Sequence, residues 1–240
     1  MLFRSEAVER VCAMGLEKGW EPGERAGYHI YTGWYVLGEI VKRVDGRPID
    51  LFVAEEIFEP LGMVDCWIGI PHGEQENLGD ALGINEQTMV EPIERIHGLP
   101  DQIAMLRPSS NFRGPVRQLG RFYAALLARG RGVFWPDTVE RFTVPSRVGM
   151  VDETFGVKID WSLGFMIHSV KYGDRHAYDF GPHASERSYG HAGNQCSCGF
   201  VDPAHRLVVA WACNGQPGER AHQERNSAIN AAIYEDLGLA

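Results

Sequence analysis

The 240-residue sequence has no apolar run that approaches the roughly 18 residues of a membrane-spanning helix. Residues 1–6 also lack the long apolar core of a secretory signal peptide. Positive charge is scarce, because 23 lysines and arginines stand against 32 acidic residues and leave a net charge of −9. These shortages exclude the basic footprint of a nucleic-acid-binding protein, and they predict a soluble, cytoplasmic chain with no nucleic-acid or membrane partner.

Cysteine is sparse as well, and the five residues are too few and too scattered for a disulfide scaffold in a chain of this size. Cys196 and Cys198 form a Cys-x-Cys pair without a second pair. On a strand both sulfurs would share one face as small apolar packing groups. The nine histidines are dispersed and His-Glu-x-x-His is missing, so we expect no metal site and no cofactor.

Hydrophobic residues make up 44% of the chain, which suffices for the core of one domain, or of one domain with a subdomain. Apolar residues at helical spacing predict helices over residues 6–16, 34–45, 51–58 (with Asp50 as N-cap), 115–129, 136–142 and 219–237. Strands are predicted over residues 161–170, 188–189, 198–201 and 207–213, with a hairpin connection at 202–205. Strands followed by a terminal helix indicate an α+β fold, an antiparallel sheet covered by helices.

A tyrosine stands between a turn and a helix in the stretch 22–38. Pro22-Gly23 is a strong turn signal, Tyr28 follows, and the apolar helix begins after Gly33. The helix packs through its apolar residues and ends at the glycine of Asp45-Gly46. We therefore expect the backbone of Tyr28 to be fixed while its hydroxyl faces a cleft.

A second candidate stretch, residues 189–194, lies on an expected edge strand of the sheet. Gly193 would let a substrate approach the strand closely, and the backbone amide of Asn194 could stabilise an oxyanion. His191 could donate a hydrogen bond or carry charge near the substrate. The alternative is that His191 is simply a hydrogen-bonded histidine after a turn.

These two stretches resemble motifs of the serine β-lactamase and penicillin-binding-protein superfamily, in its branch of β-lactamase-like esterases. The resemblance runs, with gaps, from about residue 20 to about residue 214. His191 and Gly193 match the His-x-Gly that often replaces Lys-Thr-Gly in this branch. The other landmarks, in chain order, are Pro22-Gly23, Tyr28-His29, Thr32-Gly33-Trp34, Leu37-Gly38-Glu39, Gly46-Arg47, Pro60-Leu61-Gly62-Met63 and Trp67-Ile68-Gly69-Ile70-Pro71.

The resemblance implies a β-lactamase/transpeptidase-like fold with a helical subdomain at about 69–135 and the sheet with its terminal helix at about 160–240. It implies serine acylation and hydrolysis of a small ester or amide, with Tyr28 as general base or proton shuttle and His191 beside the substrate. Gly193, Asn194 and His29 would bind the substrate or its oxyanion. For His29, a hydrogen bond that fixes the loop is an equally good interpretation.

The nucleophile motif of that superfamily, Ser-x-x-Lys, is absent. The residues three before the four lysines are Gly15, Glu39, Phe155 and His168. In the family the motif precedes the tyrosine by a long stretch, so we expect this chain to correspond to the C-terminal two-thirds of such a protein, without its N-terminal part. A Gly-x-Ser-x-Gly elbow is also missing, and Ser188 lies at an odd strand separation from His191.

Three functions remain open. The first is a β-lactamase-like serine hydrolase, a carboxylesterase or related acyl hydrolase, and the missing nucleophile motif leaves open whether the isolated chain is active. The second is a non-catalytic binding protein, or a fragment or subunit completed by another chain, because a missing central helix would expose an apolar groove that promotes homo-oligomers or a partner. The third is an acyltransferase of the same fold, which differs only in its acceptor.

Overall fold

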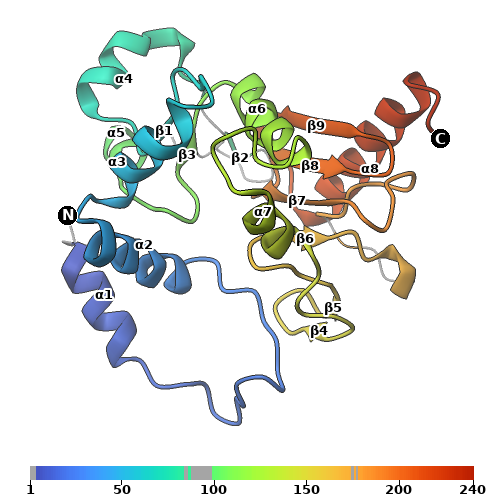
Figure 1. Ribbon diagram of the computed structural model, residues 1–240, viewed down its shortest axis with the longest axis horizontal. Helices are drawn as coiled ribbons and strands as arrows, with labels where there is room; N and C mark the ends of the chain where they lie inside the picture. The colour runs from blue at the N-terminus through green and yellow to red at the C-terminus, as the bar shows by residue number, and fades with distance from the viewer. Residues whose placement is uncertain (1–3, 84–85, 88–98, 174–175, 177) are drawn as a thin grey trace.

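A four-stranded antiparallel sheet forms the centre of the computed structural model, which describes residues 4–83, 86–87, 99–173, 176 and 178–240 (Figure 1). The strands lie in the order β6-β7-β8-β9. Their bounds are Met166–Ile167 for β6, Tyr189–Gly193 for β7, Ser197–Asp202 for β8 and Leu207–Ala212 for β9. This combination of helices with an antiparallel sheet confirms the predicted α+β fold.

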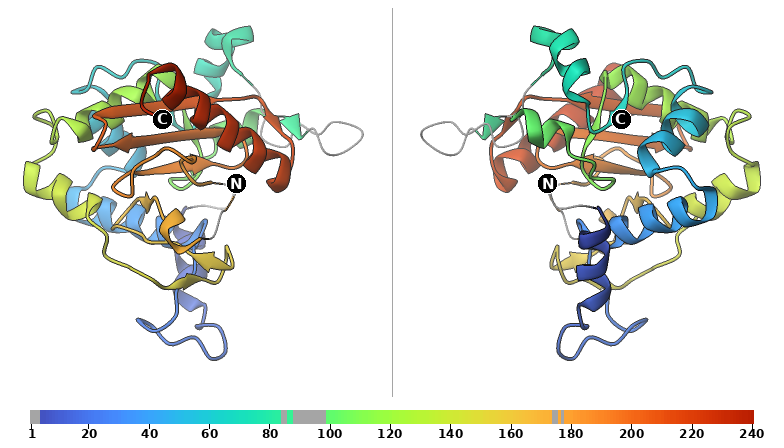
Figure 2. Two further views of the ribbon diagram at one scale, coloured as in Figure 1. Left: turned by 90° about the vertical axis from the view of Figure 1, so that its right-hand side faces the viewer. Right: turned by 90° about the vertical axis from the view of Figure 1, so that its left-hand side faces the viewer.

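Helices cover both faces of the sheet, because alternate residues of each strand are apolar and point to opposite sides. On one face α8 (Glu219–Asp236) packs over Cys198, Phe200 and Val209. On the other, α6 (Val116–Leu127) and α7 (Pro136–Thr143) pack over Tyr189 and Val201. The red helix α8 lies in front of the strands in one view of Figure 2 and behind them in the opposite view.

The remaining helices and strands lie mainly in the first half of the chain, and most of them are short. The helices are α1 (Arg4–Ala13), α2 (Thr32–Asp45), α3 (Ile49–Val53), which continues as a π-helix (Ala54–Phe58), α4 (His72–Leu78), α5 (Pro100–Ala104) and the 3-10 turns Gly79–Ala81 and Val170–Tyr172. The two-residue strands are β1 (Trp67–Ile68) with β3 (Phe112–Arg113), β2 (Glu86–Gln87) with β10 (Gly215–Gln216), and β4 (Val151–Asp152) with β5 (Val157–Lys158).

The long helices confirm the predictions from periodicity, whereas two local predictions are wrong. Helix α2 ends where expected, because Gly46 has φ 95° and its N–H donates to the Lys42 carbonyl at 3.0 Å. Asp50 is not the N-cap of α3, because Pro48 holds that position and Asp50 lies in the first turn. The strand expected over 161–170 shrinks to β6, because Ser162 and Phe165 close a turn within it.

The hairpin β4–β5 was not predicted, and it receives the loop formed by residues 14–31. This loop leaves α1 and runs along the lower side of the molecule in Figure 1 before it enters α2. Ala26 bridges Asp152, and the Glu153 N–H donates to the Ala26 carbonyl at 2.9 Å. The hairpin thus fixes the loop just before Tyr28.

Helix α2 carries an apolar stripe that the described residues leave at least half exposed. Leu37 is 54% exposed, Ile40 50% and Val44 83%, and Gly38 alone among the residues of α2 is buried. The spacing of three and four residues places these side chains on one face of the helix. None of the helices in the described part of the chain is long and apolar enough to cross a bilayer.

Candidate active site

The backbone of Tyr28 is anchored on Asp152, a fully buried carboxylate at the end of β4. The Tyr28 N–H donates to Asp152 Oδ1 at 3.1 Å, and the Thr154 hydroxyl donates to the Tyr28 carbonyl at 3.0 Å. The same Oδ1 also accepts the N–H groups of Thr154 and Phe155 at 3.1 and 3.4 Å. One carboxylate therefore shapes the β4–β5 turn and fixes the tyrosine on it.

Arg147 links this carboxylate to the aromatic packing of the site. Its Nη2 donates to Asp152 Oδ2 at 2.6 Å, and its guanidinium lies over the Trp161 ring, 5.3 Å from the centroid. Backbone hydrogen bonds of 2.9 Å join Arg147 and Trp161 in both directions. Since Trp161 stacks on Tyr28, the backbone and the ring of the tyrosine are held by one connected set of contacts.

The Tyr28 ring lies between two aromatic rings and next to His191. Trp161 stacks on it at 5.2 Å and 14°, and Phe155 at 5.6 Å and 29°. The centroid of the His191 ring is 5.6 Å away. Burial of the phenol, followed by its proximity to Tyr31 and Asp152, raises the pKa of Tyr28. The phenol is therefore protonated at neutral pH here, and a nearby cation would be needed to make it a base.

His191 is a neutral histidine with a defined tautomer. Its Nδ1 lies 2.8 Å from the Ala192 carbonyl oxygen, which can only accept, so Nδ1 carries the proton. Burial lowers the pKa of His191, and the hydrogen bond to Ala192 opposes that effect. At neutral pH the ring thus presents Nε2 as an acceptor, rather than the charge that the sequence left open.

Strand β7 is not the edge strand that the sequence predicts, because β6 lies outside it in the sheet, but among the described residues the second half of β7 has no strand partner on that side. Strand β6 pairs only with Tyr189 and Gly190, and the His168 N–H donates to the Ser188 carbonyl at 2.9 Å on the same side. Backbone groups of an antiparallel strand alternate in direction, so those of Ala192 also face this side. Within the described residues no strand pairs with 191–193 there.

Gly193 and Asn194 lie where β7 turns into β8. A Cβ at Gly193 would meet the Ser197 hydroxyl at 2.2 Å, a contact that rotation of the serine side chain would have to relieve. Asn194 is exposed, and its carbonyl accepts from Gln216 Nε2 at 3.1 Å.

Comparison with known proteins identifies the family. The sequence model of the beta-lactamase family, described as "Beta-lactamase", matches residues 5–233. The chain belongs to the beta-lactamase family. This confirms the resemblance drawn from the ordered motifs around Tyr28 and His191.

Individual relatives of this beta-lactamase-family chain include an N-acetylmuramyl-L-alanine amidase of Bacillus subtilis (strain 168), 26% identical over 206 residues, with 78% of this chain and 44% of the relative covered. A putative D-alanyl-D-alanine carboxypeptidase of Escherichia coli (strain K12) is 25% identical over 243 residues, with 93% and 52% covered. A crystal structure of a penicillin-binding protein homologue from Caulobacter crescentus superposes with a TM-score of 0.69 at 26% identity, with 95% and 64% covered. The chain spans about half the length of the two curated relatives.

His29 lies apart from the other candidate residues of this beta-lactamase-family chain. Its side chain is exposed, and its Nδ1 lies 2.6 Å from the Thr32 hydroxyl at the start of α2. This contact matches the alternative interpretation, a hydrogen bond that fixes the loop. The rings of Tyr28 and His191 lie together, and Gly193 and Asn194 follow His191 at the end of β7, whereas the His29 side chain contacts Thr32 at the start of α2.

Sequence reasoning missed Asp152, Arg147, Trp161 and Phe155, which surround the tyrosine. The sequence predicts Trp161 at the start of a strand, and no local pattern indicates that its ring contacts Tyr28. Among the described residues of this beta-lactamase-family chain, no group of three or more His, Cys, Asp or Glu side chains could hold a metal ion.

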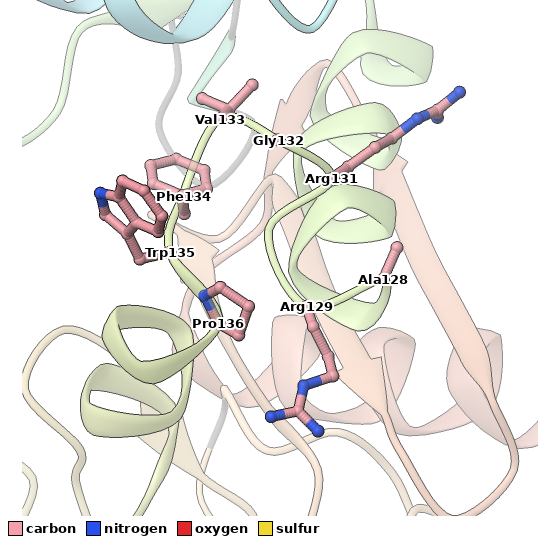
Figure 3. A pocket seen from close by; sticks show the side chains of 8 residues that line it. All are labelled: Ala128, Arg129, Arg131, Gly132, Val133, Phe134, Trp135 and Pro136. Carbon is pink, nitrogen blue, oxygen red and sulfur yellow. The ribbon is translucent and has the colours of Figure 1, made fainter.

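A surface hollow lies apart from these residues. It has a volume of about 560 Å³ and lies in the loop between α6 and α7 (Figure 3). Arg129, Arg131 and Trp135 are among its lining residues, and none of the candidate site residues reaches it. In this beta-lactamase-family chain the hollow is therefore separate from the candidate site.

Proposed function

We propose that this chain carries the tyrosine and histidine side of a serine hydrolase site that cleaves acyl groups from small esters or amides. The observation that supports this most strongly is the packing of the Tyr28 ring 5.6 Å from the His191 ring, beside a bare stretch of β7. The names of two relatives, an amidase and a putative carboxypeptidase, agree with hydrolysis of acyl compounds.

The bare edge of β7 would receive the substrate. The backbone groups of Ser188, Gly190 and Ala192 face that side, and the Asn194 amide, one residue beyond the end of β7, would be the oxyanion donor. The free Nε2 of His191 would accept a hydrogen bond from the substrate or its leaving group. The Tyr28 hydroxyl would pass the proton between nucleophile and leaving group.

A serine nucleophile and a cation are still required. The 240 residues contain no Ser-x-x-Lys, and the raised pKa of Tyr28 keeps the phenol protonated without a cation beside it. In this proposal both groups come from a segment outside these residues. A lysine ammonium close to the Tyr28 oxygen would lower the phenol pKa and activate it as a base.

The test is hydrolysis of p-nitrophenyl acetate and butyrate by the purified chain, with Tyr28→Phe and a matched Tyr35→Phe control. Turnover that Tyr28→Phe abolishes and Tyr35→Phe leaves intact supports the role of Tyr28, and a covalent serine probe then locates the nucleophile. Turnover that survives Tyr28→Phe contradicts that role. A folded but inactive chain agrees with a nucleophile outside these residues, and the assay is then repeated with a Ser-x-x-Lys segment supplied. Turnover that depends on Tyr28 is expected there, and its absence favours the second candidate.

The second candidate is a subunit or binding protein completed by another chain, and the exposed stripe of Leu37, Ile40 and Val44 favours it. An apolar face of this kind promotes association. Light scattering would give the molar mass of the wild-type chain and of a Leu37→Gln/Ile40→Gln variant. A homo-oligomer that the double substitution dissociates supports this candidate, whereas a monomer that binds no partner contradicts it.

A further inference from the structure

The turn that follows Gly193 adopts a conformation that its sequence does not favour. Gln195, in the middle of the turn 194–196 between β7 and β8, has φ 52°. This φ lies in the left-handed region, which glycine adopts without steric cost and in which a residue with a Cβ is strained. A strained residue persists only when its surroundings hold it there.

The side chain of Gln195 is held at both of its polar atoms by the beginning of α8. Its Oε1 accepts the N–H of Gly218, the N-cap residue of α8, at 2.7 Å. Its Nε2 donates to Glu219 Oε1 at 3.1 Å. The glutamine thus satisfies a backbone donor that the helix start leaves without an intrahelical partner.

The backbone of the turn is held from the same helix. Nη2 of Arg225 donates to the Gln195 carbonyl, and it also reaches the Gly215 carbonyl at 3.0 Å. The Tyr178 hydroxyl donates to Glu219 Oε1 at 2.6 Å and lies 3.5 Å from Asn194 Oδ1. The turn is therefore bonded to α8 through its side chain and its backbone.

We propose that Gln195, Glu219 and Arg225 form a clamp that fixes the turn 194–196 and so positions the backbone amide of Asn194. They are positioning residues, since none of them needs to touch the substrate. The clamp explains how the turn 194–196, which contains no glycine, keeps Gln195 at φ 52°, because side-chain bonds to α8 hold it there. The catalytic benefit rests on the proposed function, whereas the clamp itself does not.

Amide hydrogen exchange, followed by NMR on the full 240-residue chain, tests the clamp without requiring turnover. In Arg225→Met we expect the Cys196 and Gly218 amides, which donate to the Gly193 carbonyl and to Gln195 Oε1, to exchange at least about tenfold faster, the factor that one or two lost hydrogen bonds give. The matched control is Arg220→Met, which removes a 94% exposed side chain of the same helix that pairs with Glu224. Exchange of the Cys196 and Gly218 amides should not change in this control.

A second variant separates positioning from stability. Gln195→Gly relieves the strain at φ 52° and removes the side-chain bonds, so the urea midpoint should stay close to wild type while the Cys196 and Gly218 amides exchange faster. Unchanged exchange of these two amides in both Gln195→Gly and Arg225→Met would overturn the clamp. Where the esters are turned over, Gln195→Gly should lower kcat and leave KM unchanged; loss of this effect alone would count against the oxyanion role of Asn194 and leave the clamp standing.

Discussion

Removing the carboxylate of Asp152 should destabilise the protein and release Tyr28. This fully buried group accepts three backbone N–H bonds, from Tyr28, Thr154 and Phe155, and a charged bond of 2.6 Å from Arg147. Asp152→Ala leaves all four donors without this acceptor. Asp152→Asn keeps one oxygen acceptor but sets its amide N–H₂ against the guanidinium of Arg147.

The magnitude follows from these contacts. Breaking one side of a buried ion pair costs about 3–5 kcal/mol, so Asp152→Ala should lower the free energy of unfolding by about that amount. Asp152→Asn loses one charge-assisted hydrogen bond and should cost about 1.5–3 kcal/mol. Since domains are typically stable by roughly 5–15 kcal/mol, Asp152→Asn should stay folded in the absence of urea, and Asp152→Ala should lose a large part of its free energy of unfolding.

Urea unfolding followed by circular dichroism measures the effect, and NMR exchange of the Tyr28 amide reports on the loop. The matched control is Glu153→Gln, the next residue, whose carboxylate pairs with Arg25 at the surface with both side chains more than a third exposed. Its urea midpoint should barely move. The reasoning fails if Asp152→Ala is no less stable than Glu153→Gln, or if its Tyr28 amide exchanges at the wild-type rate.

Three further predictions follow from single sites. Burial would raise the pKa of Asp202, but hydrogen bonds from Ser185, His205 and Tyr234 lower it below the usual value. The ionised carboxylate therefore stabilises the folded protein fully above about pH 4, and this stabilisation is lost as pH falls through the folded-state pKa. Urea midpoints at pH 7 and pH 3 should differ less in Asp202→Asn than in wild type. A Cβ at Gly199 would lie 2.4 Å from Tyr123 Cε2, so Gly199→Ala should cost about 1–3 kcal/mol, whereas Gly164→Ala, which meets nothing within 4 Å, should stay within about 0.5 kcal/mol in the same urea experiment. The tyrosinate absorbance lost in Tyr28→Phe should titrate above pH 10, because burial raises the pKa of Tyr28, and a midpoint at or below 10 would refute that environment.

Local sequence patterns were sufficient for the parts of the fold that are themselves local. Helix α6 shows six apolar residues on one face and a glycine after its end, and the structure places Gly130 there with φ 99°. The hairpin between β8 and β9 was readable from Asp202-Pro203 between two apolar runs. In these segments the hydrophobic periodicity and the turn residues predict the same structure, and the tertiary contacts are consistent with that local preference.

The surroundings of Tyr28 could not be predicted in the same way. Strand β4 is only two residues long, and its carboxylate meets a tyrosine 124 residues earlier in the chain. No short pattern marks Arg147 or Phe155, since their positions depend on that long-range pairing. The motifs did locate Tyr28 and His191, and the structure brings their rings together. The roles of the candidate residues and the division into a helical subdomain and a sheet region stay predictions.

The bonds between the turn 194–196 and α8 also order events during synthesis. A ribosome adds roughly 5–20 residues per second, so β7 and β8 are made before α8. Until residues 218–225 have left the exit tunnel, Gln195 has no helix start to cap and its carbonyl has no arginine to bind. We expect a nascent chain that ends at residue 215, and is held on the ribosome by a linker spanning the exit tunnel, to have a formed hairpin with a loose tip. The end of β7 next to the candidate residues would then take its final shape among the last events of folding.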